Sequence, residues 1–302
     1  MEERNGAGNG SEEKLSKSEE QAAIDRMPFQ NYRIADTEIL KTIEGRTCCE
    51  SCRKSRKYFC YTCCTPVIDR RYFPRVKLPI KIDIIKHPNE VDGKSTAIHA
   101  AILAPDDVTI YRYPEFPKTL NKEETILIFP SKDASSIEAL FAESVKEGDT
   151  SVERDLQAEF PVKRAIFIDS TWQQTKQIYR DKRFRGIRCV ILKSRISQFW
   201  RHQKKSPRWY LATIEAIHQF LVELHSCVFG RVEGYATDLG SAVSNGERDS
   251  VANDERANGC TEVDRRYNGQ YDNLLYFFKY MYYEIHTMYN HDDLLAYKRP
   301  LT

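Results

Sequence analysis

The sequence contains no run of apolar residues long enough to span a bilayer, and its first residues are charged or small rather than apolar. We therefore expect neither a membrane protein nor a secreted one, and place the chain inside the cell. Its nine cysteines then lack the oxidising environment in which disulfide frameworks form, so reduced thiols or metal ligands are expected. Apolar residues make up 41% of the 302 residues, which is enough for a substantial buried core.

The sequence also has little net charge, +2, but this average conceals two basic and two acidic segments. Residues 176–208 contain twelve Lys or Arg residues against one acid, and residues 46–81 contain ten against two. Acids dominate residues 1–25 and 231–264. The binding of a polyanionic partner depends on where the charges lie along the chain rather than on the net charge.

Aromatic residues, Tyr179, Phe199 and Trp209 among them, are interleaved with the bases of segment 176–208. A short charge run is usually solvated surface, but bases combined with flat rings suit both the phosphates and the unstacked bases of an RNA loop. We therefore expect a nucleic acid partner, with loop-type RNA favoured over duplex DNA. The residues expected to contact phosphates are Lys176, Arg180, Arg201 and Arg208.

Composition divides the chain into a flexible tail (residues 1–26), a cysteine module (45–70) and an α/β domain (71–302) with a polar insertion at 231–266. The α/β class follows from short β-branched runs that alternate with helical spacing. The expected strands are Leu78–Lys86, Val108–Tyr111, Thr125–Phe129, Arg164–Ile168 and Cys189–Leu192. The expected helices are Ser135–Lys146, Trp172–Asp181, Thr213–Val228 and about Tyr271–Asn290.

The cysteine module carries two Cys-x-x-Cys pairs with seven residues between them. Four thiolates at this spacing are typical ligands of one tetrahedral zinc ion, and they would close its coordination shell, which makes a structural site. The expected ligands are Cys49, Cys52, Cys60 and Cys63. The adjacent Cys48 and Cys64 leave the ligand choice open by one position at each end. Buried reduced thiols are the alternative, although the surrounding Arg and Lys residues fit it poorly.

The tetrapeptide Asp169-Ser170-Thr171-Trp172 follows an apolar run and precedes a helical pattern. In open α/β sheets, ligands bind outside the carboxyl ends of the strands, so a binding loop is expected here. A simpler alternative is that Ser170 or Thr171 caps the helix, with Asp169 near the positive end of its dipole. That alternative does not account for the tryptophan.

Further motifs flank this tetrapeptide and, together with the cysteine module, make the sequence resemble the DTW-domain family. In chain order they are His87-Pro88-Asn89-Glu90, Lys94-Ser95-Thr96, Ile128-Phe129-Pro130-Ser131, Asp169-Ser170-Thr171-Trp172 and Ala212-Thr213-Ile214-Glu215-Ala216. The resemblance covers about residues 45–228 and resumes in the last expected helix. The tail and the insertion lie outside it.

The resemblance implies a SPOUT-like α/β domain in which the chain passes through a trefoil knot and forms a pocket for S-adenosylmethionine. It also implies a tRNA-uridine aminocarboxypropyltransferase, which moves the 3-amino-3-carboxypropyl group of this co-substrate to N3 of a tRNA uridine and releases methylthioadenosine. Uridine 20 of the D-loop is the expected target. A nuclear location rests on the resemblance alone, with the cytoplasm as the alternative.

By the positions of the family motifs, three segments are expected to line the co-substrate pocket. Their residues are Phe129, Pro130 and Ser131, then Asp169, Ser170, Thr171 and Trp172, then Thr213 and Glu215. Uridine N3 becomes a nucleophile only as its proton leaves, so Asp169 is the expected general base. Purely structural roles are the alternatives for two of these residues. Glu215 could cap a helix or pair with an arginine, and Trp172 could be a core residue.

Two rival functions suit the same residues. One is a SPOUT-type RNA methyltransferase that uses the same co-substrate and differs in the mass of its product. The other is a non-enzymatic zinc- and RNA-binding module in which the Asp-Ser-Thr-Trp sequence only caps a helix.

Overall fold

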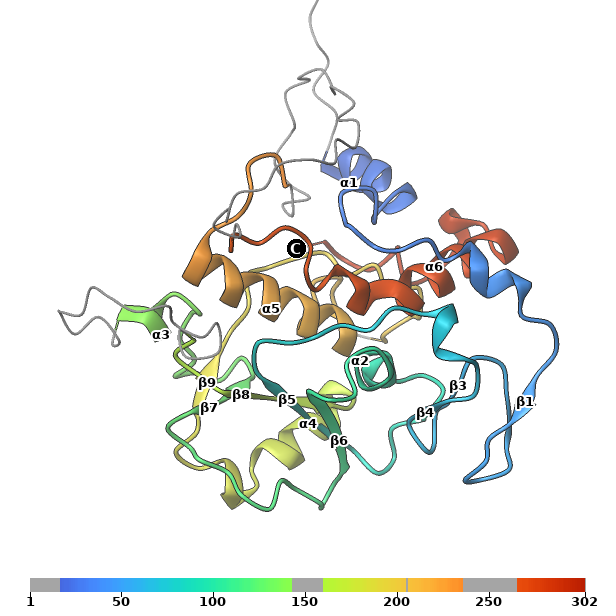
Figure 1. The fold of residues 1–302 in the computed structure, drawn as a ribbon. Helices are drawn as coiled ribbons and strands as arrows, with labels where there is room; N and C mark the ends of the chain where they lie inside the picture. Colours follow the sequence, from blue (N-terminus) through green and yellow to red (C-terminus); the bar gives the residue numbers. More distant parts are fainter. Residues whose placement is uncertain (1–16, 143–159, 205, 236–264, 302) are drawn as a thin grey trace, which may run out of the picture.

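A five-stranded parallel sheet forms the centre of the computed structural model, which describes residues 17–142, 160–204, 206–235 and 265–301 (Figure 1). Its strand order is β6-β5-β8-β7-β9. The strands are β5 (Lys81–Lys86), β6 (Val108–Arg112), β7 (Thr125–Ile128), β8 (Arg164–Asp169) and β9 (Arg188–Val190). All five expected strands are confirmed, with differences of at most three residues at their ends.

The sheet is buried on both faces, which explains why its strands are nearly continuous apolar runs. In β5, Ile82 and Ile84 join the larger hydrophobic cluster, whereas Ile85 joins a second cluster with Leu127 and Ile166. Side chains of a strand alternate between its two faces, so these two clusters lie on opposite faces of the sheet. The α/β class expected from the sequence is therefore confirmed as a three-layered arrangement.

Helices cover the two faces unequally (Figure 1). On one face, α2 (Ala97–Leu103) and α5 (Thr213–Phe229) pack against each other and the sheet, and α6 (Tyr276–Met288) adds aromatic side chains to the same cluster. On the other face, α4 (Trp172–Tyr179) contributes Ile178 to the second cluster. Among the described residues, no helix is both long and apolar enough to cross a membrane.

The remaining elements are short. They are α1 (Lys17–Arg26), α3 (Ala139–Ala142), the 3-10 turns Glu38–Thr42, Arg70–Tyr72, Lys182–Phe184, Asp272–Leu275 and His291–Asp293, and the two-residue strands β1 (Thr47–Cys48), β2 (Ser55–Arg56), β3 (Phe59–Cys60) and β4 (Thr65–Pro66). The helix expected at Ser135–Lys146 is present only as α3, and residues 143–146 lie outside the described residues. Helix α2 was not expected, and the last helix is preceded by a 3-10 turn.

The two ends of the expected insertion at 231–266 meet beside the end of α5. Arg231 pairs with Tyr267 in an isolated bridge, and the Val232 amide donates to the Tyr267 carbonyl at 3.1 Å. The Tyr267 side chain is completely buried. The chain therefore leaves and re-enters the domain at one place, while residues 236–264 lie outside the described residues.

The expectation of a flexible tail over residues 1–26 is wrong for residues 17–26, which form helix α1, and residues 1–16 lie outside the described residues. Asp25 at the end of this helix accepts two hydrogen bonds from Arg208, at 2.7 and 2.8 Å. Both side chains are at most 3% exposed. Arg208 therefore holds α1 against the domain, and its burial corrects the expectation that it contacts RNA phosphates.

We predict that Arg208→Ala lowers the free energy of unfolding by about 3–5 kcal/mol, because it leaves the buried Asp25 carboxylate without its charged partner. Urea denaturation of the full chain measures this. Arg201→Ala is the matched control, since Arg201 is exposed and its removal should change stability by only about 0.5 kcal/mol or less. Equal stabilities of the two variants would contradict the assignment.

Candidate functional site

The carboxylate of Asp169 lies at the carboxyl end of β8 and is only 4% exposed. Ser95 Oγ donates a hydrogen bond to one of its oxygens, and Thr213 Oγ1 donates to the other, each at 2.6 Å. Each donor comes from a different motif of the sequence. The structure thus brings three of the motifs together around one carboxylate.

Backbone contacts reinforce this junction. The His87 amide, just after β5, donates to the Asp169 carbonyl at 3.0 Å. The Ile214 amide, in the first turn of α5, donates to Thr96 Oγ1 at 3.1 Å. The starts of α2 and α5 and the ends of β5 and β8 are therefore fixed relative to one another.

Burial raises the pKa of Asp169 above its usual value, while the two hydroxyl donors and the charge of Lys86 oppose this rise. Lys86 lies beside Asp169 in the register of β5 and β8, and it pairs with Asp92 at 2.5 Å. Burial and the Asp169 carboxylate together also raise the pKa of Glu90. The site therefore holds a carboxyl group with increased proton affinity next to a cation.

The residues after Asp169 have different environments: Thr171 caps a helix, whereas Trp172 is exposed. Thr171 and Gln174 form a reciprocal capping box at the start of α4, so the capping alternative describes Thr171 correctly. Ser170 shares a hydrogen bond of 2.8 Å with Thr175. Trp172 is 37% exposed, and its ring centroid lies 4.3 Å from that of Tyr210. Trp172 is thus not a core residue, and sequence reasoning missed Tyr210 as its neighbour.

The segment Phe129, Pro130 and Ser131 follows β7, which pairs directly with β8. Because the strands are parallel, this segment and the Asp169 loop leave the same edge of the sheet. Pro130 is exposed and the other two residues are half-buried. The Phe129 ring stacks on the ring of Tyr179 in α4, with 4.1 Å between the ring centroids. This contact attaches the segment to the helix that follows Asp169.

Glu215 occupies a different position from the one expected. It is completely buried, and its carboxylate accepts hydrogen bonds from the Ala212 amide at 2.9 Å, the Gln198 amide at 2.7 Å and Ser197 Oγ at 2.6 Å. A side chain without exposed surface has no access to a ligand. Glu215 therefore caps α5, which is the structural alternative given for it in the sequence analysis.

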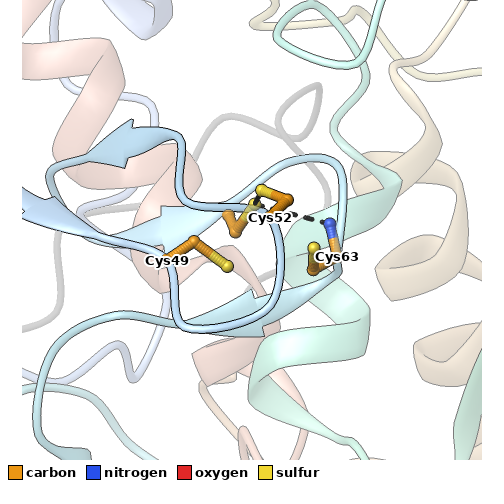
Figure 2. Close-up of side chains that lie close together, drawn as sticks. Cys49, Cys52 and Cys63 are labelled. Carbon is orange, nitrogen blue, oxygen red and sulfur yellow. Dashed lines mark hydrogen bonds between the residues drawn. The ribbon is translucent and has the colours of Figure 1, made fainter.

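The four sulfurs of Cys49, Cys52, Cys60 and Cys63 all lie within 4.8 Å of one another. Figure 2 shows the labelled side chains converging from two neighbouring loops. A tetrahedral ion with metal–sulfur bonds of about 2.3 Å would hold sulfurs about 3.8 Å apart, and the Cys52 and Cys60 sulfurs are 3.4 Å apart. The donor set and its size therefore fit one metal ion.

The two Cys-x-x-Cys loops have the same backbone form, which distinguishes the four clustered cysteines from Cys48 and Cys64. Arg53, just after Cys52, and Cys64, just after Cys63, both have a left-handed backbone, with φ of 58° and 57°. Each of their amides donates to the carbonyl of the first cysteine of its loop, at 2.8 and 2.9 Å. Cys64 thus occupies the turn position, and Cys48 is exposed in β1. Neither belongs to the cluster of four.

The cysteine module touches the edge of the sheet that carries Asp169. Thr62, between Cys60 and Cys63, donates to Asp92 at 3.3 Å. Asp92 also binds Lys86 and, at 3.3 Å, Arg112. The module is thereby attached to the loop between β5 and α2, which contains Ser95.

Three of the four bases expected to contact phosphates are exposed. Lys176 and Arg180 lie one turn apart on and just after α4, so they share one side of that helix. Arg201 is exposed and donates to the Gly93 carbonyl at 3.2 Å, which places it beside the Ser95 loop. Only Arg208 is buried.

These features define a class: α/β proteins with a polar site at the carboxyl edge of a parallel sheet and an attached four-cysteine module. The particular family follows from comparison with known sequences. The sequence model of the DTW domain matches residues 57–286, so the chain belongs to the DTW-domain family. The match begins after the first Cys-x-x-Cys pair and includes the second.

Curated relatives carry one name, tRNA-uridine aminocarboxypropyltransferase 1. The Mus musculus protein is 39% identical over 285 residues, which cover 84% of this chain and 83% of the relative. The Homo sapiens protein is 39% identical over the same shares. The Xenopus laevis protein is 36% identical over 290 residues, 86% of this chain and 88% of the relative. No solved structure matches the chain significantly.

We predict that purified protein carries about one metal ion per chain and that Cys49→Ser or Cys60→Ser removes most of it, because three thiolates bind more weakly than four. Elemental mass spectrometry measures the metal content. Cys48→Ser is the matched control, since it removes a neighbouring exposed thiol. Metal loss in that variant, with Cys49→Ser unaffected, would refute the ligand choice.

Proposed function

We propose that this chain is a tRNA-uridine aminocarboxypropyltransferase that uses S-adenosylmethionine and modifies N3 of a uridine, with uridine 20 of the D-loop as its target. The likeness to relatives of that name over 84% of the chain carries this proposal. The junction of motifs around Asp169 supports it, because their residues lie far apart in sequence and converge on one group.

When bound, S-adenosylmethionine supplies a carbon that is activated by its bond to a sulfonium. A bond forms between this carbon and uridine N3, the carbon–sulfur bond breaks, and methylthioadenosine leaves with the electron pair. The N3 proton must be removed, and we assign that task to Asp169. Since the leaving group is already good, placement of the reacting atoms contributes most of the remaining rate enhancement.

The hydrogen bonds of Asp169 are compatible with a role as general base. An ionised carboxylate has about four lone-pair sites, and the bonds from Ser95 and Thr213 use two of them. The raised pKa strengthens the base, whereas the two hydroxyl donors and Lys86 keep the charged form accessible. Ser95 and Thr213 therefore orient the carboxylate and use about half of its acceptor sites.

The co-substrate is proposed to lie between the segments that follow β7 and β8. Phe129, Pro130 and Ser131 would line one side, and Ser170 and Trp172 the other. Thr171 and Thr213 would shape this site through the capping box and the bond to Asp169. These segments leave neighbouring strand ends and offer the half-buried hydroxyls of Ser131 and Ser170 and the exposed ring of Trp172. Such a lining suits a polar, partly aromatic small molecule.

Three further points belong to the proposal. A SPOUT-like knot is compatible with the chain path, since the segment after β9 returns across the sheet edge to place Thr213 at the end of β8. The metal is proposed to be zinc with a structural role, because four thiolates leave no open position. Lys176, Arg180 and Arg201 are proposed phosphate contacts. A nuclear location, or else a cytoplasmic one, stays a prediction.

We predict that nucleoside mass spectrometry of unmodified tRNA, after incubation with the protein and S-adenosylmethionine, shows aminocarboxypropyl-uridine and released methylthioadenosine. Sequencing of nuclease fragments then locates the product. A methylated uridine would favour the methyltransferase rival. Tight tRNA binding without any product would favour the non-enzymatic module.

We predict that Asp169→Asn lowers kcat by about 10²–10⁴-fold, the usual contribution of a general base, with tRNA affinity retained. Because burial raises the pKa of Asp169, kcat of the wild type should fall as pH drops through that raised value, and this dependence should disappear in the variant. Asp133→Asn, which neutralises an exposed carboxylate near Ser131, is the control. Undiminished turnover of Asp169→Asn would exclude the base role.

A further inference from the structure

A pocket of about 560 Å³ lies between residues 202 and 206–209 on one side and the C-terminal residues 295–300 on the other. This volume is within the range of pockets that hold small ligands. Trp209 and Leu295 provide apolar wall, and His202, Lys298 and Arg299 also line it. The pocket contains none of the residues proposed to bind the co-substrate, so it is a separate feature of the molecule.

Hydrogen bonds between the two segments hold the walls of this pocket in place. His202 Nδ1 lies 3.3 Å from the Leu295 carbonyl, and the Arg208 amide donates to the Pro300 carbonyl at 3.0 Å. Arg299 Nη1 donates to the Pro207 carbonyl at 3.2 Å. The buried pair of Arg208 and Asp25 anchors one segment to α1. The pocket is therefore preformed.

The chemistry of the lining suits a flat, anionic ligand. Trp209 is 37% exposed and Leu295 is 59% exposed, so both offer apolar surface to a ligand. Lys298 is exposed, and no acidic side chain is among the lining residues. An exposed indole and an exposed lysine in the lining of one pocket are the combination that binds a base by stacking and its phosphate by charge.

The position of the pocket connects it with the candidate site. The Trp209 ring centroid lies 6.1 Å from that of Tyr210, and Tyr210 lies 4.3 Å from Trp172. Trp172 follows Asp169 by three residues. Successive contacts between three rings thus connect the loop of the proposed base with the pocket.

We propose that this pocket binds an unstacked nucleotide of the substrate RNA close to the target uridine, with its base on Trp209 and its phosphate at Lys298. The proposal rests on the proposed function for the identity of the RNA as tRNA. It adds a second point of RNA contact, which fixes the substrate loop while the target uridine reaches Asp169.

The test measures the affinity of the full chain for unmodified tRNA together with kcat and KM for transfer. Trp209→Ala should weaken tRNA binding about tenfold and raise KM correspondingly, because stacking of one base is lost. Lys298→Ala should reduce the slope of log affinity against log salt by about one unit. Both variants should bind S-adenosylmethionine as the wild type does.

Two controls remove an exposed ring and an exposed lysine outside the pocket. Tyr289→Ala removes a ring that is 57% exposed outside the pocket, and Lys41→Ala removes a lysine whose side chain is 49% exposed. Wild-type tRNA affinity in Trp209→Ala, or a loss equal to that of Tyr289→Ala, would overturn the proposal even if the wild type forms product. Weaker tRNA binding in Trp209→Ala, with no product from the wild type, would support the pocket and refute the transferase.

A second measurement does not depend on the folding of an alanine variant. The chain has three tryptophans, so 5-fluorotryptophan labelling gives three fluorine signals, which Trp209→Phe assigns. Titration with a uridine trinucleotide should shift the Trp209 signal, whereas Trp200, only 8% exposed, should stay unchanged. A Trp209 signal that responds to S-adenosylmethionine and not to the trinucleotide would overturn the proposal.

Discussion

The buried carboxylate of Asp169 is the group on which the edge of the sheet depends. Its hydroxyl donors, Ser95 and Thr213, lie 74 positions before it and 44 positions after it in the sequence. A carboxylate buried without partners costs several kcal/mol, so the folded chain must bring these segments together. The same bonds leave acceptor sites free. One side chain therefore stabilises the junction, and we propose that the same side chain accepts the proton of uridine N3.

Much of this fold follows from local patterns, and the departures have physical causes. The five strands are predictable because β-branched runs of strand length are buried on both faces. Helix α2 was missed because it is only seven residues long and six of its residues are buried, so it shows no amphipathic period. The tetrapeptide at Asp169 was placed correctly at a strand end. The family resemblance predicted Thr213 in the same pocket, but Ser95 was not predicted as a partner, since no local pattern indicates contacts across such distances.

The basic residues also show that local patterns do not predict contacts between distant segments. Arg180 and Arg208 belong to one basic segment and are indistinguishable by composition, yet one is exposed and the other is buried. The difference arises from Asp25, which lies 183 positions from Arg208 in a segment that reads as a tail. A buried arginine requires a charged partner, and that partner can come from anywhere in the chain. Net charge along a sequence therefore does not predict which of its basic residues are exposed.

The cysteine module takes part in this architecture although a metal ion bound by its four clustered cysteines would have no open position for substrate. Thr62 lies between two of the cysteines and donates to Asp92, which in turn binds Lys86 next to Asp169. Phe59, adjacent to Cys60, packs against Phe277 of α6, with 5.0 Å between the ring centroids. A metal that fixes Cys60 and Cys63 thus also fixes the loop that presents Ser95. The module is thus linked through Thr62 and Asp92 to the loop that presents Ser95, and we expect its removal to change the orientation of Asp169.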